Sequence, residues 1–357
     1  AFDSCTGLTS VTIGDSVTTI GDNAFRQCTS LTEVTIGNSV TTIGINAFRG
    51  CSSLISVNIS NSVTSIGNYV FDGCTSLTEI NVDANNNNYS SDNGILFNKN
   101  KSELIQYPPG KTETNYIIPD GVTTIRSDAF KKCNNLTSIT IPDGVTTIGD
   151  SAFYGCIRLT SVIIPDSVTT IGISAFYDCT SLTEINVDTN NENYSSDNGI
   201  LFNKNKSMLV TYPFAKKDNY GNLLTNYSIP NSVTTIAYGA FRKCSNLTSV
   251  TIPDSVTTID FVAFYQCTGL TSITMYEGIT TFGDMVFLGA NLNNVTVYYT
   301  DNQPDYDSNF PEGVTINYVI EGDENGDGVV NVLDIVAAFN NGNKHLIPSI
   351  VDTILGR

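Results

Sequence analysis

A cysteine returns every 23 residues along most of this chain, and this period limits the possible folds more than any other feature of the sequence. A phenylalanine precedes each of these cysteines by three residues, and a leucine follows each by three. A fixed period of this length is typical of a solenoid, in which each repeat packs against its neighbours. The series consists of Cys5, Cys28, Cys51, Cys74, Cys133, Cys156, Cys179, Cys244 and Cys267, and Ala290 takes the next place.

Each repeat predicts two short strands and a buried turn. In residues 8–30, Leu8, Val11 and Ile13 alternate with polar residues, which is the pattern of a half-buried strand. Residues 17–20 predict a second extended segment, and we expect the Ala-Phe-x-x-Cys stretch to be a short helical turn that places phenylalanine in the core. A repeat this short cannot bury its apolar side alone, whereas stacked coils can. The sequence therefore predicts a mainly β repeat solenoid with coils of about 23 residues.

The cysteines hold one fixed position in the coil, so we expect small buried apolar residues rather than a disulfide framework or a redox site. Their odd number, 9, and the replacement by Ala290 agree with this interpretation. Thiols of adjacent coils would lie near one another, which leaves disulfides between stacked cysteines open as an alternative.

Two related insertions interrupt the period, at residues 83–118 and 188–229. Both contain the sequence YSSDNGILFNKNKS, followed by a second tyrosine and a proline. In the first copy, residues 94–98 and 103–107 are strand-like around a polar turn at 99–102, so each insertion predicts a β-hairpin. A structural spacer and a ligand-binding element are both compatible with this pattern.

The repeat L-T-x-[VI]-x-[IV]-P-x-x-V-T-x-I-G-x-x-A-F-x-x-C resembles the BspA-type (Treponema pallidum-type) leucine-rich repeat. The resemblance covers nearly all of residues 1–297 and a degenerate last coil at 312–316. It implies right-handed leucine-rich-repeat coils in a solenoid domain at residues 1–320. It also implies a secreted or cell-surface protein, often bacterial, and in some members an adhesin.

The segment 321–357 has a different composition and contains an EF-hand-like loop. Positions 1, 3, 5, 9 and 12 of the loop carry oxygen side chains, position 7 offers a backbone carbonyl, and Gly328 allows the sharp turn. Calcium prefers oxygen ligands at this spacing, so we predict one Ca²⁺ site. Its ligands are Asp323, Asn325, Asp327, Val329, Asn331 and Asp334.

This loop and the residues after it resemble the first half of a type I dockerin, and Asp334 stands where an EF-hand has glutamate. The resemblance implies a small helical tail whose second helix is at residues 349–357, although the segment 340–348 before it lacks the acidic ligands of a second loop. A cohesin-like partner, another copy of this chain or the last coil of the solenoid are the alternatives for what the tail contacts.

Composition excludes several classes of function. The formal net charge is −18, which disfavours nucleic acid as a partner, and the sequence has no apolar run long enough to span a membrane. The single histidine, His345, lies outside the repeats, so the solenoid has no imidazole for acyl-transfer chemistry. No phosphate-binding or zinc motif is present, and we expect that the protein is not an enzyme.

The outward positions of the predicted strands favour a binding or adhesion function. They form a regular polar face, to which Ser10, Thr12, Glu33, Thr35 and Thr140 belong, and repeat proteins bind protein or glycan ligands on such faces. A face that serves only solubility is the alternative, and its glutamates and asparagines disfavour ice binding. A structural subunit that forms a filament or surface array through its open first coil and its tail is a second hypothesis. A hard-ligand calcium loop suits an extracellular or cell-surface location.

Overall fold

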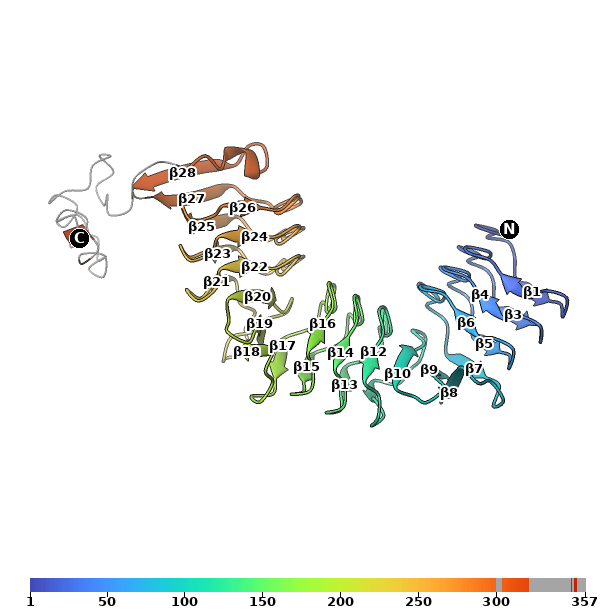
Figure 1. The fold of residues 1–357 in the computed structure, drawn as a ribbon. Helices are drawn as coiled ribbons and strands as arrows, with labels where there is room; N and C mark the ends of the chain where they lie inside the picture. The colour runs from blue at the N-terminus through green and yellow to red at the C-terminus, as the bar shows by residue number, and fades with distance from the viewer. Residues whose placement is uncertain (300–303, 321–347, 349, 352–357) are drawn as a thin grey trace. The chain divides into compact units, whose positions relative to one another are not determined.

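The computed structural model describes residues 1–299, 304–320, 348, 350 and 351, and its ribbon is shown in Figure 1. The chain divides into two compact units, and each is described here by itself. Unit 1 consists of residues 1–205 and 213–216, and unit 2 consists of residues 206–212 and 217–357. The predicted mainly β solenoid is confirmed in both units.

The first strand of each coil in unit 1 joins one of two parallel four-stranded sheets. Equivalent residues pair at an offset of one coil, as Ser10 does with Glu33. The first sheet contains β1 (Ser10–Ile13), β3 (Glu33–Ile36), β5 (Ser56–Ile59) and β7 (Glu79–Val82). The second contains β11 (Asn115–Ile117), β13 (Ser138–Thr140), β15 (Ser161–Ile164) and β17 (Glu184–Val187).

The second extended segment of each coil forms a two-residue strand, as the repeat predicts. One parallel set contains β2 (Thr19–Ile20), β4 (Thr42–Ile43) and β6 (Ser65–Ile66). The next contains β12 (Thr124–Ile125), β14 (Thr147–Ile148) and β16 (Thr170–Ile171). This set continues into the first insertion through β10 (Glu103–Gln106), β9 (Ile95–Asn98) and β8 (Tyr89–Asp92).

Unit 2 repeats this plan. Its parallel five-stranded sheet contains β21 (Asn226–Ser228), β23 (Ser249–Thr251), β25 (Ser272–Tyr276), β27 (Asn294–Tyr299) and β28 (Thr315–Ile320). Its short strands are β20 (Met208–Thr211), β22 (Thr235–Ile236), β24 (Thr258–Ile259) and β26 (Thr281–Phe282). A 3-10 helix, η1 (Asp307–Asn309), precedes β28, which confirms the degenerate last coil as a strand.

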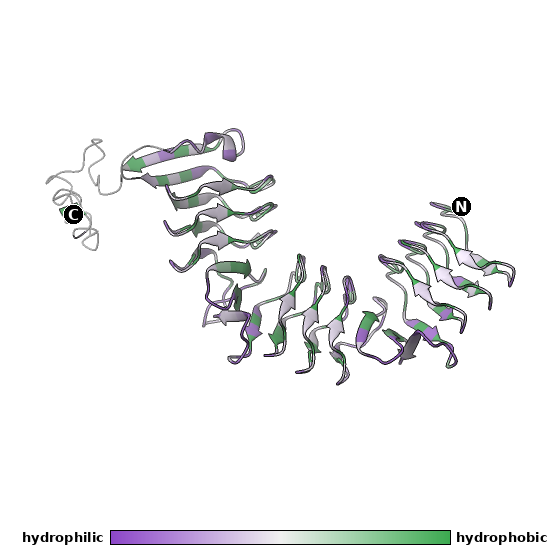
Figure 2. Cartoon of the chain, viewed as in Figure 1, coloured by the Kyte–Doolittle hydropathy of each residue, from purple (hydrophilic) through white to green (hydrophobic). Residues whose placement is uncertain are grey.

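Hydropathy alternates along the strands, which is clearest in β27 and β28 (Figure 2). In β3, Val34 and Ile36 are buried while Glu33 and Thr35 are exposed. The apolar side chains of each strand therefore point into the coil and the polar ones point to solvent. This alternation has a period of two residues, as expected for a strand with one buried face.

The turn that carries the phenylalanine is not helical, so the expected helical turn is wrong. Within it, Ala47 N–H donates to the carbonyl oxygen of Gly44, but alternate residues donate to the next coil instead. An α-helix propagates through bonds from each N–H to the carbonyl four residues earlier, and here every second N–H is bonded to the next coil instead. No residue from 1 to 299 is helical. The donors to the next coil are Asn46, Phe48 and Gly50, and the acceptors are the carbonyl oxygens of Asn68, Val70 and Asp72.

We call this set of bonds, repeated from coil to coil, the turn column. Asn46 and Gly50, whose N–H groups belong to the turn column, have positive φ angles of 56° and 75°. The column brings the phenylalanine rings into a continuous stack inside the coils. In unit 1 the Phe153 ring lies 5.1 Å from that of Phe130 and 5.4 Å from that of Phe176, centroid to centroid.

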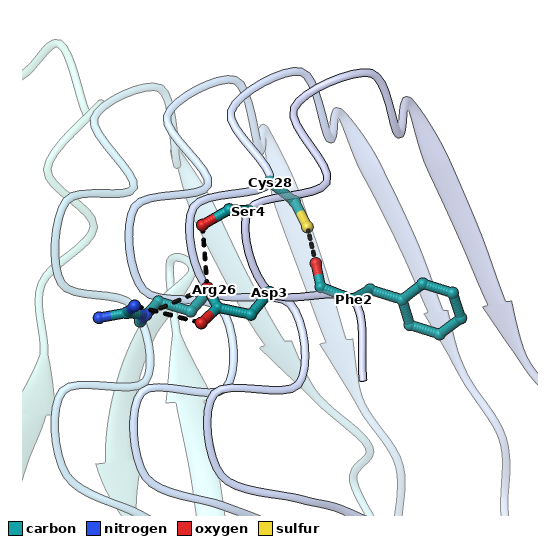
Figure 3. Close-up of polar contacts among 5 residues, drawn as sticks. All are labelled: Phe2, Asp3, Ser4, Arg26 and Cys28. Carbon is teal, nitrogen blue, oxygen red and sulfur yellow. Dashed lines mark hydrogen bonds and ion pairs between the residues drawn. The ribbon is translucent and has the colours of Figure 1, made fainter.

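The cysteines behave as predicted in all coils but the first. All nine are free thiols, eight are buried and Cys5 is exposed. They also make a contact that the pattern did not predict, because each buried thiol donates to the carbonyl oxygen of a residue in the preceding coil. Cys51 Sγ lies 3.1 Å from Phe25 O, and Cys28 makes the same contact with Phe2 beside the ion pair of Asp3 and Arg26 (Figure 3).

The first insertion contains the predicted hairpin, since β9 and β10 pair antiparallel with a register shift between Leu104 and Gln106. It also contains a strand that the sequence pattern did not predict, β8, which pairs antiparallel with β9. Asn93 and Gly94 join them with positive φ angles of 47° and 75°. An Asn-Gly dipeptide is the strongest short hairpin signal, so the sequence did carry the information. The second insertion has the same pair, β18 (Tyr194–Asp197) and β19 (Ile200–Asn203).

Asn86 fixes the entry of the chain into the first insertion. It is fully buried, and its Nδ2 donates to the carbonyl oxygens of Ser60 and Val63 at 2.8 and 2.9 Å. Its Oδ1 accepts from the backbone N–H groups of Asn88 and Tyr89, both at 2.8 Å. A buried amide whose hydrogen bonds are all satisfied stabilises this one backbone conformation, because any other conformation would leave the amide without partners.

Candidate binding surface

The predicted polar face exists on the outer side of the long strands. In the sheet of β1, β3, β5 and β7, strand pairing places equivalent side chains in rows that cross the strands. Strands lie about 4.8 Å apart, so each row presents hydrogen-bonding groups at that spacing. One row contains Ser10, Glu33, Ser56 and Glu79, and the other contains Thr12, Thr35, Asn58 and Asn81.

A groove of about 310 Å³ continues this polar face at the ends of the strands. Its lining includes the side chains of Asn38, Asn58, Asn81 and Asp83. Asn81 Nδ2 contacts Glu79 Oε2 at 3.3 Å. Amide and carboxylate groups offer both donors and acceptors, so the groove suits a polar ligand.

The second sheet of unit 1 presents a different surface. Ile117 pairs with Thr140, and Ile163 pairs with Asn186, in the row where the first sheet has threonine and asparagine. Ile117 is 72% exposed and Ile163 is 64% exposed. The outward alternation of the strands does not predict apolar residues there, and sequence reasoning missed them although they stand in the threonine position of the repeat.

In unit 2, aromatic side chains extend the rows. Tyr276 and Tyr298 pair across β25 and β27, and their rings stack at a centroid distance of 5.5 Å. Thr274 and Thr296 pair two residues before them in the same strands. Tyrosine combines apolar contact area with a polar hydroxyl, which is a common composition for binding surfaces.

The buried thiols are poor nucleophiles. Burial raises the pKa of Cys51 and Cys267 to about 12, and raises the pKa of Cys156 and Cys179 well above the usual range of a thiol. A nucleophilic cysteine needs the thiolate, which these surroundings disfavour.

The predicted calcium ligands Asp323, Asn325, Asp327, Val329, Asn331 and Asp334 lie outside the described residues, as does His345. Within the described ranges, no three histidine, cysteine, aspartate or glutamate side chains come together as a metal site. The described part of the chain also contains no helix with the length and apolar character of a membrane span.

Comparisons with known proteins agree with this architecture. The family model described as BspA type leucine rich repeat region matches residues 1–115, 110–220 and 215–307. A leucine rich cell surface protein from Faecalibacterium prausnitzii is 30% identical, with 87% of this chain and 79% of that chain covered and a TM-score of 0.53. A leucine-rich repeat protein from Eubacterium ventriosum is 27% identical, with 86% and 87% covered and a TM-score of 0.51. No curated protein matches the chain.

Proposed function

The chain belongs to the BspA-type leucine-rich repeat family, and on that premise we propose that it is a non-enzymatic binding or adhesion protein of the bacterial cell surface or exterior. The observation that carries the proposal is the set of exposed rows on the strand face. Rows of Ser, Thr, Asn and Glu at a fixed spacing match the repeated hydrogen-bonding groups of an extended protein or glycan ligand. The similar surface protein of Faecalibacterium prausnitzii supports the location.

A charge-introducing variant of this face tests the proposal. Thr12, Thr35 and Thr140 are exposed outward positions, and replacing all three by Lys puts long cations into the rows. We expect binding to immobilised matrix proteins or cell-wall glycans to fall at least tenfold, measured by surface plasmon resonance. The matched control carries Ser16→Lys, Asn61→Lys and Thr112→Lys, which add the same charge at exposed positions off the strands. Equal binding by both variants would remove the strand face from the proposal.

We further propose that the tail binds one Ca²⁺ and serves attachment or docking. The support is the oxygen-ligand spacing of residues 323–334. Calorimetric titration of the full chain should give one calcium site, and Asp323→Ala with Asp327→Ala should abolish it. A titration without binding heat at millimolar calcium would contradict the proposal.

Light scattering with and without calcium then distinguishes the roles of the tail. A monomer in both conditions agrees with docking to a cohesin-like partner. Growth of assemblies when calcium is added would favour the alternative function, a structural subunit that forms a filament or surface array.

A further inference from the structure

The turn column stops where the first insertion begins. In earlier coils, every second N–H of the turn donates to the next coil, as Asn46 and Phe48 do. Tyr69, Phe71 and Gly73 occupy the same positions one coil later, and no described residue accepts from their N–H groups. The insertion accounts for this, because only Ile105 and Gln106 lie between Leu104 in β10 and Tyr107, whereas four residues separate the equivalent Ile125 and Phe130 of the next coil. Unpaired backbone N–H groups in line are strong donors that require a partner.

Two of these residues, Tyr69 and Phe71, line a pocket of about 260 Å³ within unit 1. One wall is the turn of residues 66–72, the other is formed by residues 126–128 with Asp150, and Leu96, Ile105 and Gln106 also line it. The pocket therefore lies where the turn of the insertion is two residues shorter than in a regular coil.

An ion cluster spans the pocket's two walls. Lys131 Nζ lies 3.3 Å from Asp72 Oδ2 on one wall and 3.0 Å from Asp128 Oδ1 on the other. Arg49 adds a second cation to Asp72 at 3.1 Å. Burial raises the pKa of Asp128, whereas its hydrogen bond to Lys131 opposes that rise.

Charges in and against the pocket balance. Three carboxylates, Asp72, Asp128 and Asp150, and three cations, Arg49, Arg126 and Lys131, lie in or against the pocket, so its formal charges cancel and it favours neither an anion nor a cation. Its lining includes donors, the N–H groups of Tyr69 and Phe71 and the Arg126 guanidinium, and acceptors, such as the carboxylates of Asp72 and Asp150. A ligand that satisfies both must carry groups that donate and accept, as hydroxyls do.

The second insertion shows that the fold does not require this polar set. The residues that match Arg126, Asp128 and Asp150 in sequence are Ala237, Gly239 and Phe261. The residue that matches Asp72 is Tyr177. Two insertions with the same internal sequence thus differ at the residues that give the first its charged pocket, so the hairpin itself does not require this set.

We propose that this pocket binds one neutral sugar residue of a glycan. The volume suits a single sugar ring, the hydroxyls match the mixed donors and acceptors, and the Tyr69 side chain, 47% exposed, supplies an aromatic surface beside them. The inference deepens the proposed function by assigning it a second, separate ligand contact in unit 1.

The unpaired N–H groups provide the test. The amide signals of Tyr69 and Phe71 are followed by ¹H–¹⁵N NMR of the full chain during titration with neutral hexoses, N-acetylhexosamines and, in parallel, the dipeptide Gly-Gly. We expect a sugar to shift these two signals saturably, while the paired amides of Asn46 and Phe48 stay in place. Arg126→Ala should weaken the effect roughly tenfold, because a charged hydrogen bond is lost. Exposed Arg158→Ala is the control and should have no effect.

Two outcomes would overturn the inference. Shifts with Gly-Gly but with no sugar would identify a peptide site, and no shift with any probe at millimolar concentration would leave only a hydrated cavity. The Arg126→Ala protein is also assayed on the matrix proteins and glycans used for the strand face. If this variant still binds those ligands and the amide signals of Tyr69 and Phe71 do not shift with any sugar, the pocket is not a sugar site, whereas the proposed function of the strand face stands.

Discussion

The interface between two regular coils and the interface at the first insertion are held together by different interactions. Between regular coils, as at Phe153, backbone bonds, a ring stack and a buried thiol repeat in register. At the insertion, the backbone bonds of the turn stop after Asp72, and side-chain charges join the two sides instead. The comparison shows that a solenoid tolerates a break in its backbone ladder if side chains hold the coils on either side of it.

The largest effect is expected from a break in the regular interface. Phe153 is fully buried between the rings of Phe130 and Phe176, so Phe153→Ala leaves a cavity in the stack. We expect a loss of about 3–5 kcal/mol in the free energy of unfolding, measured by urea denaturation. The exposed Ile163→Ala should change it by less than about 0.5 kcal/mol. Similar values for the two variants would show that the stack does not stabilise the coils.

The ion cluster at the insertion should contribute less. Lys131→Met keeps the aliphatic stem but leaves Asp72, whose side chain is 7% exposed, with one cation fewer. We expect a loss of about 2 kcal/mol, the usual cost of losing a charged hydrogen bond in a partly buried site. The control is Lys101→Met, since the pair of Lys101 and Asp92 is nearly half exposed and should contribute below about 1 kcal/mol. If Lys131→Met is as mild as its control, side-chain charges do not replace the backbone ladder.

The hydroxyl of Tyr89 provides a test with a smaller expected effect on the stability of the insertion interface. It accepts from the backbone N–H of Ile66 at 3.0 Å, which ties the insertion to the preceding coil. Tyr89→Phe removes this acceptor alone, and we expect a loss of about 1 kcal/mol by thermal denaturation. Tyr220→Phe, at a side chain 90% exposed, should leave the melting temperature unchanged.

The smallest expected effect is a pH dependence at the insertion interface. Burial raises the pKa of Asp128 above its ordinary value of 3.8. A raised carboxyl pKa gives stability that is present below pH 3.8 and lost as pH rises through the folded value. The stability of Asp128→Asn relative to the natural chain should therefore increase as pH rises through that range. A difference that is constant with pH would mean that Lys131 compensates the burial fully.

Much of the regular interface was predictable from the sequence, because a strict period leaves few alternatives. Cys51 and Phe48 hold repeated positions, so one physical argument covers every coil. The insertion was less predictable, since its features occur in single residues. Asn86 is one of four consecutive asparagines, and nothing in that run marks it as the buried one. The ion pair beside the pocket joins Asp72 and Lys131, which lie 59 positions apart and are brought together only by the shortened turn of the insertion.

The helical turn was mispredicted for a related reason. The short Ala-Phe-x-x-Cys stretch was expected to be helical from its own residues alone. In the structure, every second N–H of the stretch instead donates to a carbonyl oxygen of the neighbouring coil. The candidate face was predictable as a polar surface because the strand period is local. The exposed apolar residues of this face, Ile117 and Ile163, were not predictable. The strand period indicates which way a side chain points, but not which side chains the surface needs for its contacts.

The turn column has a consequence for the electrostatics of the stack. All of its bonds have the same sense, with each N–H directed to the following coil and each carbonyl directed to the preceding one. Peptide dipoles that align in this way add up, as they do along an α-helix. The last turn before the insertion is therefore the positive pole of a short column of aligned dipoles. Asp72 lies in that turn, so its carboxylate stands where this polarity favours negative charge.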